Sequence, residues 1–88
     1  MFIMEKEYFA DIIMNKEQLS DGSSVFVVHC TNLGIATQGE THEEAIKMIK
    51  EAIELYLEEK PEDYEFLRKA DNPPIFSFIE IKRPIQNA

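Results

Sequence analysis

Three side chains in this sequence have the chemistry of metal ligands or nucleophiles: His29, Cys30 and His42. Zinc sites need imidazole and thiolate groups that converge on one ion. His29 and Cys30 are adjacent in an expected strand, where successive side chains point to opposite faces, so both cannot reach the same ion. A cysteine nucleophile needs a base and an electropositive setting, and the sequence around Cys30 indicates neither. We therefore expect no metal site and no cofactor, with Cys30 acting as a small buried apolar residue.

Carboxylates are too sparse on the expected strands for a two-metal nuclease. Such enzymes hold their ions with acids from neighbouring strands. Asp11 lies in the first strand, but residues 25–30 and 35–38, the second and third strands, carry no acid. The three glycines match no phosphate-binding loop. We predict that the chain is not an enzyme and keep a residual metal-dependent nuclease as the least favoured alternative.

Charge and composition indicate the class of partner. The chain has 88 residues, 17 acids and nine bases, with a net charge of −8. Phosphate contacts need clustered Lys and Arg, so we expect no direct binding of nucleic acid by this chain. An acidic surface attracts a basic protein, although the charge is equally explained as a means of staying soluble. No apolar stretch approaches the roughly 20 residues of a membrane span, and the start of the chain is unlike a secretory signal. The single cysteine cannot form a disulfide within the chain, which fits a reducing compartment. We therefore expect a cytoplasmic protein.

The apolar pattern predicts a single α+β domain over residues 1–88. Residues 2–14 alternate as a strand, Asp21-Gly22 marks a turn in the loop that follows, and residues 25–30 and 35–38 complete an antiparallel sheet. After Asn72-Pro73-Pro74, residues 75–82 read as the last strand. Together with the helices described next, the order is β-β-β-α-β with a short extra helix before the last strand, similar to part of the ribonuclease H fold.

One long helix is expected on one face of this sheet. Thr41 and Glu44 form a capping box at its start, and apolar residues recur every three or four positions as far as Leu57. Glu43–Lys47 and Lys50–Glu54 are spaced for supporting ion pairs. Pro61 then stops the helix or opens the short second one.

Apolar residues on the other face of the sheet predict self-association. The last strand has isoleucines on one face and Phe76 and Phe78 on the other, and the first strand places Phe9 and Ile13 on its outer side. One helix covers only one face, so a second subunit is expected to cover these four residues in a homodimer or homotetramer. The alternative is that the short second helix folds across them.

The block Thr37-Gln38-Gly39-Glu40-Thr41, followed by Glu43-Glu44-Ala45 and later Tyr56-Leu57, resembles the HicB family of antitoxins over residues 8–59. The resemblance implies a partial ribonuclease H fold without nuclease activity. It also implies a partner, a small basic RNA-cleaving toxin of the HicA type, whose active site the antitoxin masks. The family's Leu-Pro-Gly-Cys turn is replaced here by Asn32-Leu33-Gly34-Ile35. The chain resembles short members that lack a C-terminal DNA-binding domain, so we do not expect it to bind operator DNA alone.

The sequence thus predicts an antitoxin-type binding protein. The expected contact residues are exposed acids at and after the helix start: Glu40, Glu43, Glu44, Glu51 and Glu54. Turn and cap geometry explain the Thr-Gln-Gly block equally well. A solitary HicB-like oligomer with a regulatory or structural role and no toxin partner remains the main alternative.

Overall fold

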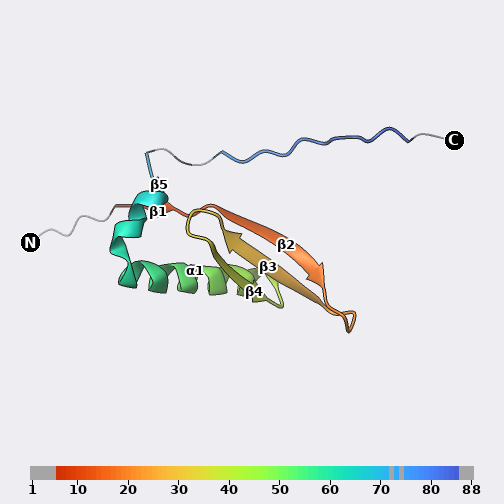
Figure 1. Ribbon diagram of the computed structural model, residues 1–88, viewed down its shortest axis with the longest axis horizontal. Coiled ribbons are helices and arrows are strands. Elements are labelled where there is room, and N and C mark those ends of the chain that lie inside the picture. Colours follow the sequence, from red (N-terminus) through yellow and green to blue (C-terminus); the bar gives the residue numbers. More distant parts are fainter. Residues whose placement is uncertain (1–5, 72, 74, 86–88) are drawn as a thin grey trace, which may run out of the picture.

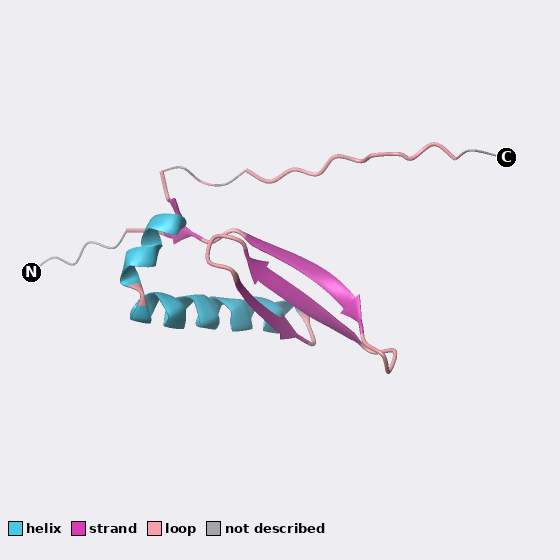
Figure 2. Cartoon of the chain, viewed as in Figure 1, coloured by secondary structure: helices cyan, strands magenta, loops and turns pink. Residues whose placement is uncertain are grey.

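The computed structural model describes residues 6–71, 73 and 75–85. It is an α+β fold with two antiparallel sheets and one main helix (Figures 1 and 2). In chain order the elements are β1 (Tyr8–Phe9), β2 (Ile12–Gln18), β3 (Ser24–Cys30), β4 (Ile35–Gly39), α1 (His42–Glu59), the 3-10 helix η1 (Pro61–Phe66) and β5 (Arg68–Lys69).

The larger sheet has the order β2-β3-β4, so β2 and β4 are its edges. The β2–β3 hairpin runs from Ile12 opposite Cys30 to Gln18 opposite Ser24. Gly22 closes it at a φ of +89°, a backbone conformation that only glycine adopts without strain. β2 therefore extends to Gln18, whereas the sequence predicted a strand ending at residue 14. The alternation of apolar residues stops earlier because the end of the hairpin is exposed on both faces.

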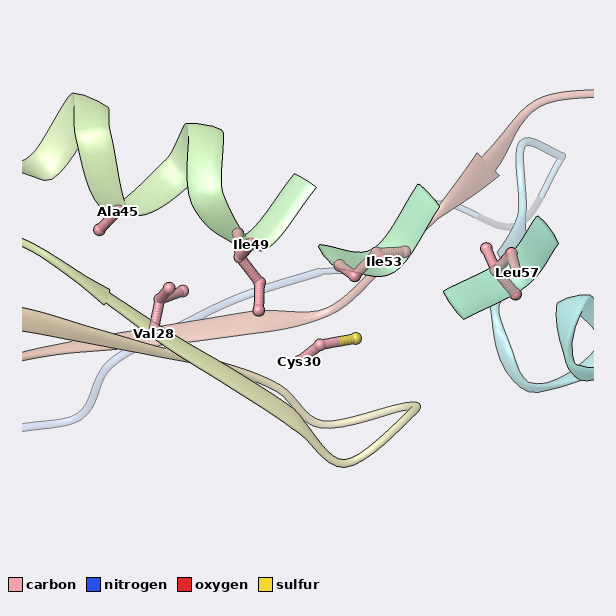
Figure 3. Packing of buried hydrophobic residues seen from close by; sticks show 6 residues of the cluster. All are labelled: Val28, Cys30, Ala45, Ile49, Ile53 and Leu57. Atoms are coloured by element: carbon pink, nitrogen blue, oxygen red, sulfur yellow. The ribbon is translucent and has the colours of Figure 1, made fainter. Parts of the chain in front are cut away.

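Helix α1 confirms the sequence prediction and packs over β3 and β4. The buried positions Ala45, Ile49, Ile53 and Leu57 follow a spacing of four, which places them on one side of the helix. They meet two buried side chains of β3, Val28 and Cys30 (Figure 3). This small cluster is the hydrophobic core of the domain.

The expected first strand is divided in two. β1 pairs with β5, and β2 pairs with β3, so the chain changes sheets at residues 10–11. At this junction the backbone N–H of Asp11 donates to Oδ1 of Asn32 at 2.6 Å. Nδ2 of Asn32 donates in turn to the carbonyl of Phe66 at 3.0 Å and so joins this junction to η1. Residues 2–5 of the predicted strand lie outside the described residues.

The short second helix is confirmed as η1, which has Pro61 in its first turn. It sits at the end of α1, where the ring of Tyr64 lies 5.0 Å from that of Tyr8, centroid to centroid. Leu67, just after η1, packs against the core cluster. η1 therefore closes one end of the domain and does not run across the sheet.

The predicted last strand does not form. Residues 75–85 adopt no helix or strand and extend away from the body (Figure 1). Ile75 is 94% exposed and Phe78 is 99% exposed. A strand exists only where a neighbouring backbone accepts its hydrogen bonds, and this segment, which we call the tail, has no such neighbour here. The tail explains a radius of gyration of 17.6 Å, against about 12 Å expected for a compact chain of this length.

Candidate protein-binding surface

The candidate surface begins at Gly39, where β4 ends against the first turn of α1. Gly39 is buried and pairs with Phe26. A Cβ atom at this position would lie 2.6 Å from the backbone nitrogen of Ala45. Real Cβ atoms do not approach backbone atoms so closely, and therefore glycine is required by contact and not by an unusual φ angle. This close approach fixes where Glu40 and the helix start lie.

Thr41 caps the helix as predicted. Its Oγ1 accepts a hydrogen bond from the backbone N–H of Glu44 at 3.1 Å. The reciprocal bond of a full capping box, from the Thr41 N–H to the Glu44 carboxylate, is not formed in the part of the chain that the structure describes. The Glu44 side chain is exposed instead, at the helix end where the macrodipole favours negative charge.

All five predicted contact acids are exposed, but the helix separates them into two groups. Glu44 and Glu51 are seven residues apart and share one flank of α1. Glu43, Lys50 and Glu54 lie on the other flank, and Lys47 lies between the two flanks. Glu40 precedes the helix, close to its first turn.

The two predicted ion pairs within the helix do not form. Neither Glu43–Lys47 nor Lys50–Glu54 is within ion-pair distance, although all four residues are described. Within residues 6–71, 73 and 75–85, the one salt bridge joins Nε of Arg68 to Oδ2 of Asp11 at 2.9 Å. Exposed lysines and glutamates gain little from pairing in water, which explains why their side chains stay apart. The glutamates of α1 therefore form no ion pair within the described residues.

Two exposed apolar residues lie among these acids, and the sequence analysis missed them. Met48 is 42% exposed and Leu55 is 62% exposed. Their spacing from Glu44 and Glu51 puts all four side chains on one flank, and we call Glu44, Met48, Glu51 and Leu55 the acidic stripe. Lys47 borders the stripe but forms no ion pair with Glu44 or Glu51, all three of which are described. Apolar residues outside the buried positions of an amphipathic helix were the sequence signal that could have revealed the stripe.

The residues considered for metal binding or catalysis do not come together. Cys30 is 1% exposed within the core, His29 is exposed on the opposite face of β3, and the His42 ring lies edge-on to Phe26 at 6.4 Å between centroids. The Asp11 carboxylate is held by Arg68. Across the described residues, no group of three or more His, Cys, Asp or Glu side chains is arranged to hold a metal ion.

Among the described residues, two ionisable groups have shifted pKa values: Tyr56 near the end of α1 and Asp21 in the hairpin loop. The Tyr56 hydroxyl donates to the Asp63 carboxylate, and this hydrogen bond, with some desolvation and the nearby charges of Asp63 and Glu62, raises the pKa of Tyr56 above its usual 10.0. The Asp21 carboxylate accepts bonds from Oγ and the N–H of Ser23, which lower the pKa of Asp21 below 3.8. These bonds stabilise the α1–η1 corner and the hairpin loop respectively.

The predicted self-association residues are all exposed, in two separate places. Phe9 and Ile13 lie on the body, and Phe76 and Phe78 lie on the tail. The alternative, that the short second helix covers them, is wrong because η1 packs on Tyr8 at the end of the domain. Whether a second subunit covers them stays a prediction.

Comparison with known proteins adds no relative. The chain matches no protein-family model, no curated protein and no solved structure. The described helices include none with the length and apolar character needed to cross a membrane.

Proposed function

We propose that this chain is a protein-binding domain that neutralises a small basic RNA-cleaving toxin of the HicA type through the acidic stripe of α1. The observation that carries the proposal is the composition of this stripe. Glu44 and Glu51 are exposed and have no ion-pair partner among the residues that the structure describes, and Met48 and Leu55 are exposed beside them. Interfaces are strongest where apolar side chains are buried at the centre and complementary charges surround them.

The acidic stripe suits a basic protein for two physical reasons. Charge complementarity accelerates the encounter and selects the sign of the partner. Burial of Met48 and Leu55 then supplies affinity that salt does not screen, because removing apolar surface from water does not depend on charge. A nucleic acid, by contrast, would be repelled by the net charge of −8.

The proposal includes the partial ribonuclease H fold that the family resemblance implies. The order β2, β3, β4 and α1 agrees with the beginning of a partial ribonuclease H fold, and the Thr-Gln-Gly-Glu-Thr block forms the turn and cap that precede the helix. We also propose a cytoplasmic location, supported by the single free and buried thiol of Cys30. The same proposal holds that the chain has no catalytic activity, since a protein that masks the active site of a toxin needs none.

The direct test mixes the purified chain with a HicA-type toxin and follows RNA cleavage. The expected result is complete inhibition at an equimolar ratio, together with a complex on size-exclusion chromatography. RNA cleavage that persists when the chain is in stoichiometric excess over the toxin would refute the proposed antitoxin function. The chain alone, assayed with divalent metal, is expected to cleave no RNA, and cleavage would favour the nuclease alternative.

Two pairs of substitutions on one helix locate the contact surface. Glu44→Gln with Glu51→Gln removes both charges of the acidic stripe, and glutamine at position 44 remains suited to the third position of the helix. Glu43→Gln with Glu54→Gln removes the same charge from the other flank and is the matched control. We expect the first pair to weaken toxin binding roughly tenfold, from one to two lost charge contacts, and the control pair to weaken it less. Equal losses would show that only net charge matters and that the acidic stripe is not the docking site.

The apolar part of the acidic stripe is tested separately. Met48→Ser with Leu55→Ser should weaken binding more than tenfold, because truncation of a central interface anchor costs about 2 kcal/mol or more. Leu19→Ser is the control, since Leu19 is another exposed apolar residue but lies in the hairpin loop. The loss should persist at high salt, unlike that of the glutamate variants.

A further inference from the structure

The described body has an open groove beside its edge strand. The groove holds about 200 Å³ and is lined by Ala10 and Ile12 on one side and by α1 on the other. The α1 residues are Ile46, Ile49, Lys50, Ile53 and Glu54. Because α1 packs mainly over β3 and β4, the β2 side of the helix is left uncovered. A groove of this composition is an incomplete core next to unpaired backbone.

β2 offers that unpaired backbone. Within the part of the chain that the structure describes, β2 pairs with β3 alone, so alternate N–H and C=O groups along its seven residues face outward. Exposed edges of this kind are templates for an added strand. A strand placed here would pair with the outward-facing N–H and C=O groups of β2 and would also cover the groove.

The tail has the properties of the missing strand. It is already extended, and residues 75–85 are long enough to run the length of β2. Its odd-numbered face carries Ile75, Ile79 and Ile81, all strongly exposed. The even-numbered face carries Phe76 and Phe78 but becomes charged at Glu80 and Lys82, whereas the odd-numbered face, which also has Ser77, stays uncharged until Arg83. The isoleucine face is therefore the one that can be buried in the groove.

Charge also favours contact between the tail and a body. Residues 75–85 contain one acid and two bases, a net charge of +1, and the chain total of −8 leaves −9 on residues 1–74. Lys82 and Arg83 would approach a strongly acidic domain. The attraction is not specific by itself, but it has the correct sign.

The tail of a second copy fits the groove better than the chain's own tail does. In the structure the tail leads away from its own body, and two consecutive prolines at 73 and 74 in the sequence favour an extended connection over a reversal. A tail with isoleucines in the groove would also turn Phe76 and Phe78 outward, toward the face of the sheet that carries Ile13. A single copy leaves these rings in water, whereas two copies can bury them together.

We propose that two copies of this chain form a dimer by exchanging tails, each tail adding a strand to β2 of the other copy and filling its groove with isoleucine side chains. Such an exchange is a symmetric, closed arrangement in which each contact occurs twice. The tail that lacks a partner in one copy is then an edge strand in the dimer. This proposal is independent of toxin binding, because the acidic stripe lies on the opposite flank of α1 from the groove.

Sedimentation of the full chain tests the exchange. The wild type should sediment at twice its mass of 10.2 kDa. Ile79→Ser with Ile81→Ser, a tail variant, should sediment as a single copy. Ile46→Lys, which places a long charged side chain in the groove, should do the same. Leu55→Lys, the same chemistry on the opposite flank, is the control and should stay dimeric.

An equimolar mixture of the tail variant and the groove variant is the decisive measurement. In an exchange, the intact tail of one variant meets the intact groove of the other, so a mixed dimer should form. A wild type of single-copy mass overturns the proposal, and so does a tail variant that keeps the dimer mass. The mixed dimer keeps one of the two exchange contacts, so it should form at a higher protein concentration than the wild-type dimer. A mixture with no mixed dimer at any concentration tested also overturns the proposal. Circular dichroism confirms that each variant is folded, and Ile46→Gln replaces the lysine variant if that one is not.

Discussion

Replacement of Gly39 by alanine tests how β4 and α1 are joined. The added Cβ atom would meet the Ala45 nitrogen at 2.6 Å, the Ala45 Cα at 3.0 Å and the Glu44 carbonyl carbon at 3.0 Å. These are backbone atoms of the first helical turn, so no side-chain rotation relieves the contact. The strand and the helix must therefore move apart.

Two effects of opposite sign set the change in the free energy of unfolding of the Gly39→Ala variant. Overpacking of this kind costs about 3 kcal/mol. Alanine also reduces the freedom of the unfolded chain, which returns roughly 0.4–1 kcal/mol. The net expectation is a loss of about 2 kcal/mol in the free energy of unfolding, or a fall of roughly 10 °C in the thermal midpoint of a domain of this size.

Chemical and thermal unfolding followed by circular dichroism measures this loss. Gln38→Ala is the matched control, because Gln38 is the exposed neighbour on β4 and its replacement should change the free energy of unfolding by less than about 0.5 kcal/mol. A Gly39→Ala variant as stable as the wild type would refute the proposed contact between the strand end and the helix backbone.

Three further predictions use the same unfolding assay or a titration. The Thr37 hydroxyl oxygen is buried without a partner in the described structure, so Thr37→Val should raise the free energy of unfolding by about 1 kcal/mol; a loss would mean that the hydroxyl is bonded. Thr41→Ala should lower it by about 1 kcal/mol through loss of the cap, whereas Thr41→Ser should not. The hydrogen bond to Asp63 should keep the pKa of Tyr56 above 10.0, as measured by phenolate absorbance. The contribution of this bond to stability is therefore present below pH 10 and lost as pH rises through the folded-state pKa. Asp63→Asn should lower the pKa of Tyr56, and an unchanged pKa would contradict the assignment.

Prediction from the sequence succeeded where the pattern is local. The helix start at Thr41, the buried positions of α1 and the hairpin turn at Gly22 each follow from residues a few positions apart. The opposite orientations of His29 and Cys30 follow from the same local geometry of a strand. For the candidate surface, the exposure of the five acids was correctly expected, but their division between two flanks and the contribution of Met48 and Leu55 were not.

Prediction failed where an element depends on a distant partner. The tail has the alternation of a strand, but alternation only specifies how a strand would bury its faces and not which backbone it pairs with. The division of the first strand has a similar cause. Asn32, 21 residues further along the chain, accepts the Asp11 N–H that a continuous ladder would have used.

The amino-acid sequence alone determined that this protein has an acidic amphipathic helix with a defined cap, because helical periodicity and capping are properties of neighbouring residues. It also determined an excess of apolar residues beyond what one helix can cover. Only the tertiary structure decided that Met48 and Leu55 stay exposed, that β2 is an open edge with a groove beside it, and that the tail is not held against its own body. These features depend on how the elements pack, and packing joins residues that are far apart in the chain.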